Sequence, residues 1–228
     1  MLLIKPPSSL ETYNDLNNEL VNFFRVLRDD PQELADRISL TPWSRSEFEF
    51  CCFQLPVEDR IEMARRLYVK LWFSYPSTLI PCKGNFRRHK NGTRSVIQEI
   101  RPQSLFDSSK RFLSVVIENR NAFQLMLDLD SPDTLFYLDP PYVFSTRSKY
   151  RAYTHEMDDD LQQKFADVVL KLKGFVVISG YPSQLYCQLF ESNGWRRVER
   201  LANTMEHTKK VEALWLSPNI KTCSTIEK

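Results

Sequence analysis

The second half of the chain alternates short apolar runs with segments of helical periodicity, and this alternation is the strongest constraint on its fold. Residues 135–138 and 175–179 are apolar and rich in β-branched or aromatic side chains, as buried strands are. Residues 158–172 between them repeat apolar side chains at helical spacing. Because strands separated by helices form largely parallel sheets with covering helices, we expect an α/β fold.

The same patterns predict further elements along the chain. We expect helices over residues 16–28, 31–38, 44–53, 58–73, 122–129, 158–172 and 183–192, and strands over residues 112–117, 135–138, 175–179 and 211–216. Ser44, with Glu47 three residues later, has the pattern of a capping box at the start of the third helix.

Composition is that of a soluble protein. The 228 residues are 42% hydrophobic and 26% charged, and the mean hydropathy is −0.40. No run of 18 apolar residues exists, and the amino-terminal Met-Leu-Leu-Ile-Lys-Pro-Pro breaks too early for a signal peptide. We therefore expect no membrane association and a cytoplasmic location.

The five cysteines predict neither a disulfide framework nor a metal site. They are Cys51, Cys52, Cys82, Cys187 and Cys223. Their number is odd and no Cys-x-x-Cys pair occurs, so the spacing of a structural zinc site is missing. We expect buried or incidental thiols and no bound metal.

Charge is distributed unevenly. The net charge of the chain is only +2, but residues 83–111 hold eight basic side chains against two acidic ones, a local net charge of +6. The remainder then sums to about −4, and this asymmetry indicates a surface that faces a polyanion. A solvated charged face without a partner is the alternative that composition leaves open.

The apolar run at residues 134–138 delivers the tetrad Asp139-Pro140-Pro141-Tyr142. Two prolines forbid further ladder pairing, so Asp139 is expected at the carboxyl edge of the sheet, where open α/β sheets bind ligands. Asp139 and the Pro140 carbonyl can accept the hydrogens of an exocyclic amino group, and Tyr142 offers a face for base stacking. The alternative is an ordinary turn that ends a strand, and the tetrad alone does not decide between the two.

Several further blocks fall in a recognisable order with the tetrad. They are Pro6-Pro7-Ser8, Tyr13-Asn14-Asp15-Leu16, Val21 to Arg28, Ile117-Glu118-Asn119-Arg120, Thr154-His155-Glu156-Met157, Ser179-Gly180-Tyr181-Pro182-Ser183 and Leu214-Trp215-Leu216. Together they resemble the Dam-like family of adenine-specific DNA methyltransferases, in a branch common in bacteriophage and prophage genomes. The similarity runs over nearly the whole chain and is weakest from about residue 74 to 111.

The resemblance implies a Rossmann-like, S-adenosylmethionine-dependent methyltransferase fold, a mostly parallel sheet with helices on both faces. Residues 1–41 and 112–228 would form the catalytic core, and residues 42–111 a mainly helical target-recognition subdomain. The implied function is site-specific methylation of the adenine amino nitrogen in double-stranded DNA after base flipping, as in restriction-modification. Relatives that act on cytosine or RNA more often carry Ser or Asn before the prolines, so those substrates are disfavoured.

Site residues carry over position by position. Asp139, Pro140, Pro141 and Tyr142 match the catalytic tetrad, and Asp139 also adjoins the cofactor. Asp15 matches the acid that binds the ribose hydroxyls of S-adenosylmethionine, although a helix cap would explain an Asp there as well. Asn121, Ala122 and Phe123 fall where relatives line the cofactor adenine; relatives often have Asp in place of Asn121. DNA contacts are assigned to Lys83, Arg87, Arg88, Lys90 and Arg94, with Tyr153 in the segment that folds over the target base.

The chain also departs from the family. Relatives have a first strand leading to a Phe-x-Gly-Gly-Gly turn, whereas this sequence has five glycines, the first at Gly84. Its Leu2-Leu3-Ile4-Lys5-Pro6-Pro7 matches residues that follow the turn, so the first strand and the cofactor loop are expected to be missing. Either an upstream start or a separately encoded amino-terminal fragment supplies them, or the chain is an inactive remnant that retains at most DNA binding.

Overall fold

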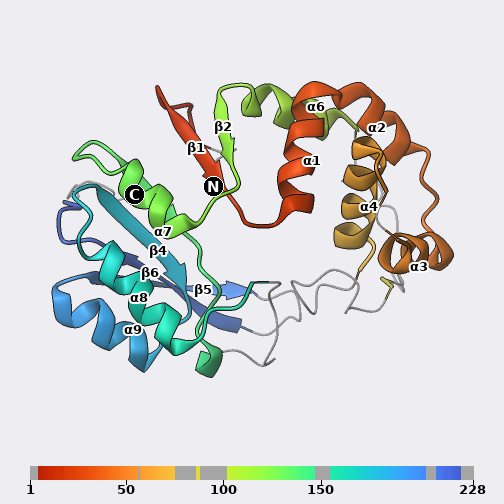
Figure 1. Cartoon of the computed structure of the whole chain (residues 1–228). Coiled ribbons are helices and arrows are strands. Elements are labelled where there is room, and N and C mark those ends of the chain that lie inside the picture. Colours follow the sequence, from red (N-terminus) through yellow and green to blue (C-terminus); the bar gives the residue numbers. More distant parts are fainter. Residues whose placement is uncertain are drawn as a thin grey trace, which may run out of the picture. The chain divides into compact units, whose positions relative to one another are not determined.

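Two compact units, Met1–Arg120 and Asn121–Lys228, make up the chain in the computed structural model (Figure 1). The structure describes residues 5–55, 57–74, 86–87, 102–146, 155–203 and 209–221. None of the helices in the described residues is both long enough and apolar enough to cross a membrane.

The first unit joins a two-stranded parallel sheet to a group of helices. Strand β1 (Glu11–Asn14) pairs with β2 (Val115–Glu118), with Glu11 opposite Val115. The helices are α1 (Asn18–Asp29), α2 (Pro31–Ser39), α3 (Arg45–Phe53), α4 (Arg60–Trp72) and α6 (Pro102–Phe112). Buried side chains of α1, α2, α4, α6 and β2 form one hydrophobic cluster, and α3 packs on α4 in a second.

Polar side chains begin these helices where the sequence indicates. Asn17 caps α1 and accepts a hydrogen bond from the Glu19 backbone N–H at 3.0 Å. Ser44 accepts the Glu47 backbone N–H at 3.0 Å, which is one half of the predicted capping box. The Glu47 carboxylate does not return the bond but pairs with Arg65 of α4 at 2.7 Å. The box residue therefore ties α3 to α4.

The second unit contains a four-stranded sheet in the order β3-β4-β6-β5. Its strands are β3 (Leu135–Leu138), β4 (Phe175–Gly180), β5 (Arg196–Asn203) and β6 (Lys209–Leu216), and its α-helices are α7 (Ala122–Asp128), α8 (Asp159–Val169) and α9 (Gln184–Leu189). β3 and β4 are parallel, whereas β4–β6 and β5–β6 are antiparallel. The α/β class is confirmed, and the sheet of this unit is mixed.

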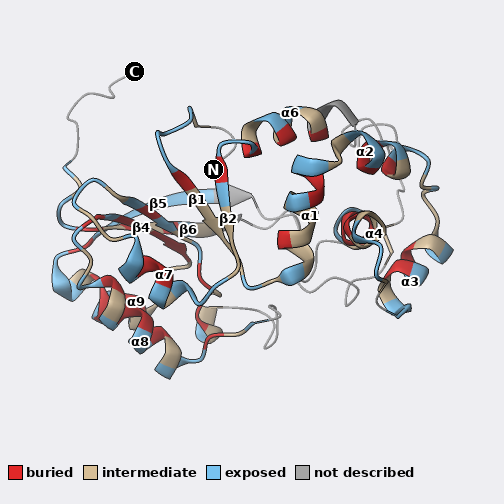
Figure 2. Ribbon diagram, turned by 45° about the horizontal axis from the view of Figure 1, so that its top comes forward, coloured by how far each residue is buried: buried red, intermediate tan, exposed pale blue. Residues whose placement is uncertain are grey.

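Successive strand residues of the second unit alternate between a covered face and an open one. Phe136, Val176 and Ile178 are buried in a cluster to which α7, α8 and α9 all contribute (Figure 2). Leu135 and Tyr137, which alternate with them, are 62% and 42% exposed. The three helices contribute to the cluster on the covered face. The expectation that helices cover both faces of the sheet stays a prediction.

Gly174 sets the alignment of β3 and β4. A Cβ atom at this position would lie 2.6 Å from the Thr134 carbonyl oxygen, so no larger residue fits there. The next residue, Phe175, donates its N–H to that carbonyl at 2.8 Å. Asp130 accepts the N–H groups of Lys173 and Gly174 and so holds the chain just before β4. This close approach fixes the register of β3 against β4, and with it the pairs of residues that lie side by side where the two strands end.

Most predicted elements are confirmed within a few residues, with three differences. The strand expected from residue 112 begins at Val115, because Phe112 ends helix α6. Neither α6 nor the charged strand β5 was predicted.

Cys51 and Cys187 are free, but Cys52 is disulfide-bonded, so the expectation of free thiols is wrong for that residue.

Candidate active site

The tetrad lies at the carboxyl end of β3, beside the end of β4. Leu138 is paired with Ile178, which places Asp139 next to Ser179. The Ser179 hydroxyl donates to Asp139 Oδ1 at 2.8 Å and approaches the Leu138 carbonyl at 3.2 Å. Ser179 is only 8% exposed, whereas Asp139 is exposed. A buried donor therefore holds an accessible carboxylate at the sheet edge.

Tyr142, the last residue of the tetrad, packs against Tyr181. Their ring centroids are 4.8 Å apart at an interplanar angle of 81°, an edge-to-face contact. Tyr181 is the residue that follows β4, and burial together with the charge of Glu212 raises its pKa. The Tyr142 and Tyr181 rings, which follow the neighbouring strands β3 and β4, are therefore in contact at the site.

The turn between Asp139 and Tyr142 is held from the core. Gln162 of α8 donates its side-chain N–H to the Pro141 carbonyl at 2.8 Å. Val143, the next residue after the tetrad, is 4% exposed. Its carbonyl accepts the N–H of Thr146 at 3.0 Å and the Thr146 hydroxyl at 2.8 Å. These bonds anchor the chain as it leaves the tetrad into the 3-10 turn Phe144–Thr146.

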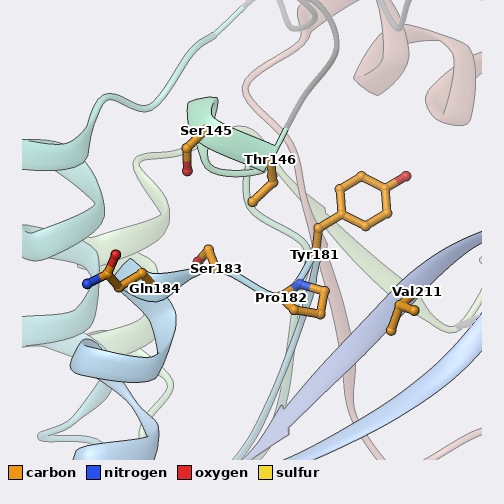
Figure 3. A pocket seen from close by; sticks show the side chains of 7 residues that line it. All are labelled: Ser145, Thr146, Tyr181, Pro182, Ser183, Gln184 and Val211. Atoms are coloured by element: carbon orange, nitrogen blue, oxygen red, sulfur yellow. The ribbon is translucent and has the colours of Figure 1, made fainter.

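An open pocket of about 420 Å³ adjoins Tyr181. It is lined by Ser145, Thr146, Tyr181, Pro182, Ser183, Gln184 and Val211. Figure 3 shows the Ser145 and Thr146 side chains pointing from the 3-10 turn towards the segment of Pro182 and Ser183. Hydroxyl and amide groups gather with an aromatic ring and a proline, a lining that suits a flat polar ring such as a nucleobase.

Asn121, Ala122 and Phe123 lie at the start of α7 in the same unit. The Asn121 side chain accepts the N–H groups of Phe123 at 2.9 Å and Gln124 at 3.3 Å, so it serves as the helix cap. Ala122 is exposed. Phe123 packs partly against the hydrophobic cluster, 6.3 Å from Phe165 between ring centroids. Their assignment to the cofactor remains a prediction.

Asp15 belongs to the first unit, where it follows β1. Its Oδ1 accepts the Asn17 N–H at 2.7 Å, and its Oδ2 accepts the Tyr13 hydroxyl at 3.2 Å. Asn17 is the cap of α1, so Asp15 is not needed for that role. A carboxylate has about four acceptor positions, which leaves room for two further donors on Asp15.

Of the predicted DNA contacts, only Arg87 falls among the described residues; Lys83, Arg88, Lys90, Arg94 and Tyr153 lie outside them. The Arg87 N–H donates to the Phe73 carbonyl at 2.7 Å, and its own carbonyl accepts the Trp43 indole N–H at 3.4 Å. The adjacent Phe86 packs into the cluster of α3 and α4. Arg87 is therefore attached to the helical part of the first unit.

Arg111 shows that not every cation of the basic segment faces solvent. It pairs with the buried carboxylate of Glu11 at 2.5 Å, and Lys5 pairs with the same carboxylate. These contacts lower the pKa of Glu11 to about 2. Arg111 thus has a structural role in joining α6 to β1.

Comparison with known proteins identifies the family of the chain. The profile of the D12 class N6 adenine-specific DNA methyltransferase family matches residues 9–226. The type II methyltransferase M1.LlaDCHI of Lactococcus lactis subsp. cremoris is 26% identical over 208 residues, which covers 82% of this chain and 70% of that protein. The chain belongs to the D12 class N6 adenine-specific DNA methyltransferase family. The predicted resemblance and enzyme class are confirmed.

Three residues of the site were given no role from the sequence: Ser179, Tyr181 and Gln162. Ser179 and Tyr181 could have been found from the pairing of two parallel strands, because residues just after neighbouring strands must lie together. Gln162 carried a different signal. It shares a helical stripe with Phe165, Ala166 and Val169, all buried, and is the polar member of that stripe.

Proposed function

We propose that the chain transfers a methyl group from S-adenosylmethionine to the exocyclic amino nitrogen of an adenine flipped out of double-stranded DNA. The observation that carries the proposal is the Asp139–Tyr142 tetrad at the end of β3, in which Ser179 holds Asp139 and Tyr142 packs against Tyr181 of the open pocket. Family membership supplies the reaction class.

The adenine amino nitrogen is a poor nucleophile, because its lone pair is delocalised into the ring. Asp139 and the Pro140 carbonyl would accept its two hydrogens and favour the pyramidal geometry that attack requires. The Tyr142 ring would stack on the base, a contact worth about 1–3 kcal/mol. Flipping is needed because the amino group of a paired adenine is inaccessible within the duplex.

S-adenosylmethionine would supply an electrophilic methyl group on its sulfonium. Asp15 fits a role in holding its ribose, since the spare acceptor capacity of its carboxylate matches two hydroxyl donors. Asn121, Ala122 and Phe123 would face its adenine, although Asn121 already caps α7 and lacks the charge that relatives have there. The Rossmann-like arrangement and the division into a core of residues 1–41 and 112–228 and a recognition segment of 42–111 are part of this proposal.

The test is Asp139→Ala. Transfer of labelled methyl groups to unmethylated DNA of mixed sequence should be abolished, with N6-methyladenine identified in the product of the parental chain. DNA binding, measured by fluorescence anisotropy, should persist because Asp139 contributes to catalysis and little to phosphate contact. Asp160→Ala is the matched control, since Asp160 is an exposed Asp in the first turn of α8.

Two results would contradict the proposal. Near-parental methylation by Asp139→Ala would show that the tetrad is not the catalytic site. DNA binding without any methyl transfer by the parental chain would favour the alternative, in which residues 1–228 only bind DNA.

A further inference from the structure

Gln162 is a fully buried polar side chain in the middle of the hydrophobic core of the second unit. Its exposed fraction is 0%, and its neighbours on the buried side of α8 are Phe165, Ala166 and Val169. An apolar side chain of the same size would fill this position without the cost of burying an amide. The residue therefore needs an explanation in its hydrogen bonds.

Both ends of the Gln162 amide are occupied, and only one orientation is consistent with the contacts. The Pro141 carbonyl can only accept, so the Gln162 Nε2 group must face it, at 2.8 Å. Oε1 then faces the Tyr186 hydroxyl at 2.9 Å and, being an acceptor, requires Tyr186 to donate. The bonds run in one direction, from Tyr186 to Gln162 to Pro141.

Tyr186 is itself rigidly packed. It is 2% exposed, and its ring makes edge-to-face contacts with Phe190 and Trp215, with centroids 5.0 and 4.9 Å away. A side chain locked in this way offers its hydroxyl at a fixed point. The hydrogen bond from Tyr186 therefore fixes the Gln162 amide, and the Gln162 amide in turn fixes the Pro141 carbonyl.

The tetrad has a particular need for such a bond. Proline fixes φ but leaves ψ free, and neither Pro140 nor Pro141 has an N–H with which to hold the turn. The direction of the Pro141 carbonyl reports ψ of that residue, and this angle also sets where the Tyr142 ring is placed. Among the described residues, no hydrogen-bond donor reaches the Pro140 carbonyl, whereas the Pro141 carbonyl is taken by Gln162.

We propose that Gln162 is a positioning residue for methyl transfer: by holding the Pro141 carbonyl from inside the core, it fixes ψ of Pro141, orients Tyr142 and leaves the Pro140 carbonyl as the acceptor for substrate. The inference rests on the proposed function, in which Asp139 and the Pro140 carbonyl receive the adenine amino group. Gln162 itself does not touch the substrate.

The experiment compares Gln162→Met with two matched controls in the full chain. Methionine keeps the length and burial of the side chain but removes both hydrogen bonds. Gln163→Met makes the same change one residue further along α8, where Gln163 is exposed and bonds only to Asp167 of its own helix in the described residues. Val169→Ala removes core volume from the same buried stripe, so it lowers stability without touching the tetrad.

Two measurements separate a positioning role from a structural one. Hydrogen exchange of the peptide covering residues 139–146 needs neither DNA nor activity. In Gln162→Met its exchange should speed up by about five- to tenfold, the size expected when one hydrogen bond is lost, and both controls should stay near parental. In methyl transfer, kcat of Gln162→Met should fall by roughly tenfold or more with KM for DNA little changed, as expected for misplaced reacting groups.

The outcomes are distinct. Unchanged exchange in Gln162→Met, or equal acceleration in Val169→Ala, overturns the proposal, as does faster exchange with parental kcat. If the parental chain transfers no methyl groups, the proposed function fails and the exchange result still decides whether Gln162 holds the tetrad. Should Gln162→Met fail to fold, Tyr186→Phe replaces it; loss of the orienting hydroxyl is expected to raise the exchange rate of the same peptide, and no rise refutes the inference.

Discussion

Replacing Ser179 with Ala would test how much the orientation of Asp139 contributes to catalysis. The substitution removes one oxygen atom and with it the 2.8 Å hydrogen bond to Asp139 Oδ1. Ser179 is 8% exposed and no charge is lost from the site. The carboxylate remains present but becomes free to rotate about its own side-chain torsions.

The effect on stability should be small and the effect on turnover larger. A hydrogen bond to a charged group contributes about 1.5–3 kcal/mol when it is buried. Asp139 is exposed, so water can replace the lost donor and the net loss of stability should be roughly 1 kcal/mol or less. A misoriented acceptor acts on the transition state instead, and kcat should fall about tenfold, which corresponds to ~1.4 kcal/mol.

Ser217→Ala is the matched control at the opposite end of β4. The Ser217 hydroxyl accepts the Val176 N–H at 2.9 Å and is also buried. Its removal leaves a buried donor unpaired, which costs about 1–3 kcal/mol, so the melting temperature should fall more than in Ser179→Ala. The expected pattern is lower kcat with a small thermal shift for Ser179→Ala and the reverse for Ser217→Ala. Parental kcat in Ser179→Ala, or equal losses of kcat in both variants, would refute the reasoning.

Three further predictions concern DNA, pH and thiols. Neutralising Arg87 and Arg88 together should weaken DNA binding and reduce the slope of log affinity against log salt by up to about two; an unchanged slope would exclude them as phosphate contacts. Because the pKa of Glu11 is about 2 in the folded chain and that of an ordinary glutamate near 4.5, the stability it provides is complete above about pH 4.5 and is lost as pH falls towards 2. Glu11→Gln should therefore reduce the change of melting temperature with pH between about pH 4.5 and 2. Cys187 is exposed and Cys51 buried with its pKa raised to about 11, so a thiol reagent should label Cys187 in the native chain and Cys51 only after unfolding, as followed by mass spectrometry.

The tetrad and its strand could be predicted because local signals agree there. A short apolar run that ends in two prolines is typical of a terminated strand, and the structure begins and ends β3 at the predicted residues. Strand β5 gave no such signal. Its sequence Arg196-Arg197-Val198-Glu199-Arg200 is charged, and it forms a strand because β6 pairs with it along its whole length. Pairing over distance, and not local composition, decides such an element.

The supporting residues of the site were invisible for a related reason. A search for periodicity rewards apolar residues, and in residues 158–172 it selects Leu161, Phe165, Val168, Val169 and Leu172. These five residues all lie in or against the core, but the same side of the helix also contains the fully buried Gln162, whose polarity is compensated by a hydrogen bond to another element. Sequence patterns therefore locate the groups that act on substrate more readily than the groups that hold them.

The two halves of the proposed reaction draw on different parts of the chain, and this gives their variants different signatures. Asp139, Pro140 and Tyr142, with their supports Ser179 and Gln162, all belong to the second unit, whereas Asp15 belongs to the first. Loss of a support leaves the acceptor groups present but less ordered, so it should lower kcat at saturating S-adenosylmethionine. Loss of the Asp15 carboxylate removes ribose acceptors, so it should raise KM for S-adenosylmethionine and spare kcat. Because the acceptors gain most of their effect from fixed position, the buried bonds behind the tetrad are expected to matter to catalysis more than to folding.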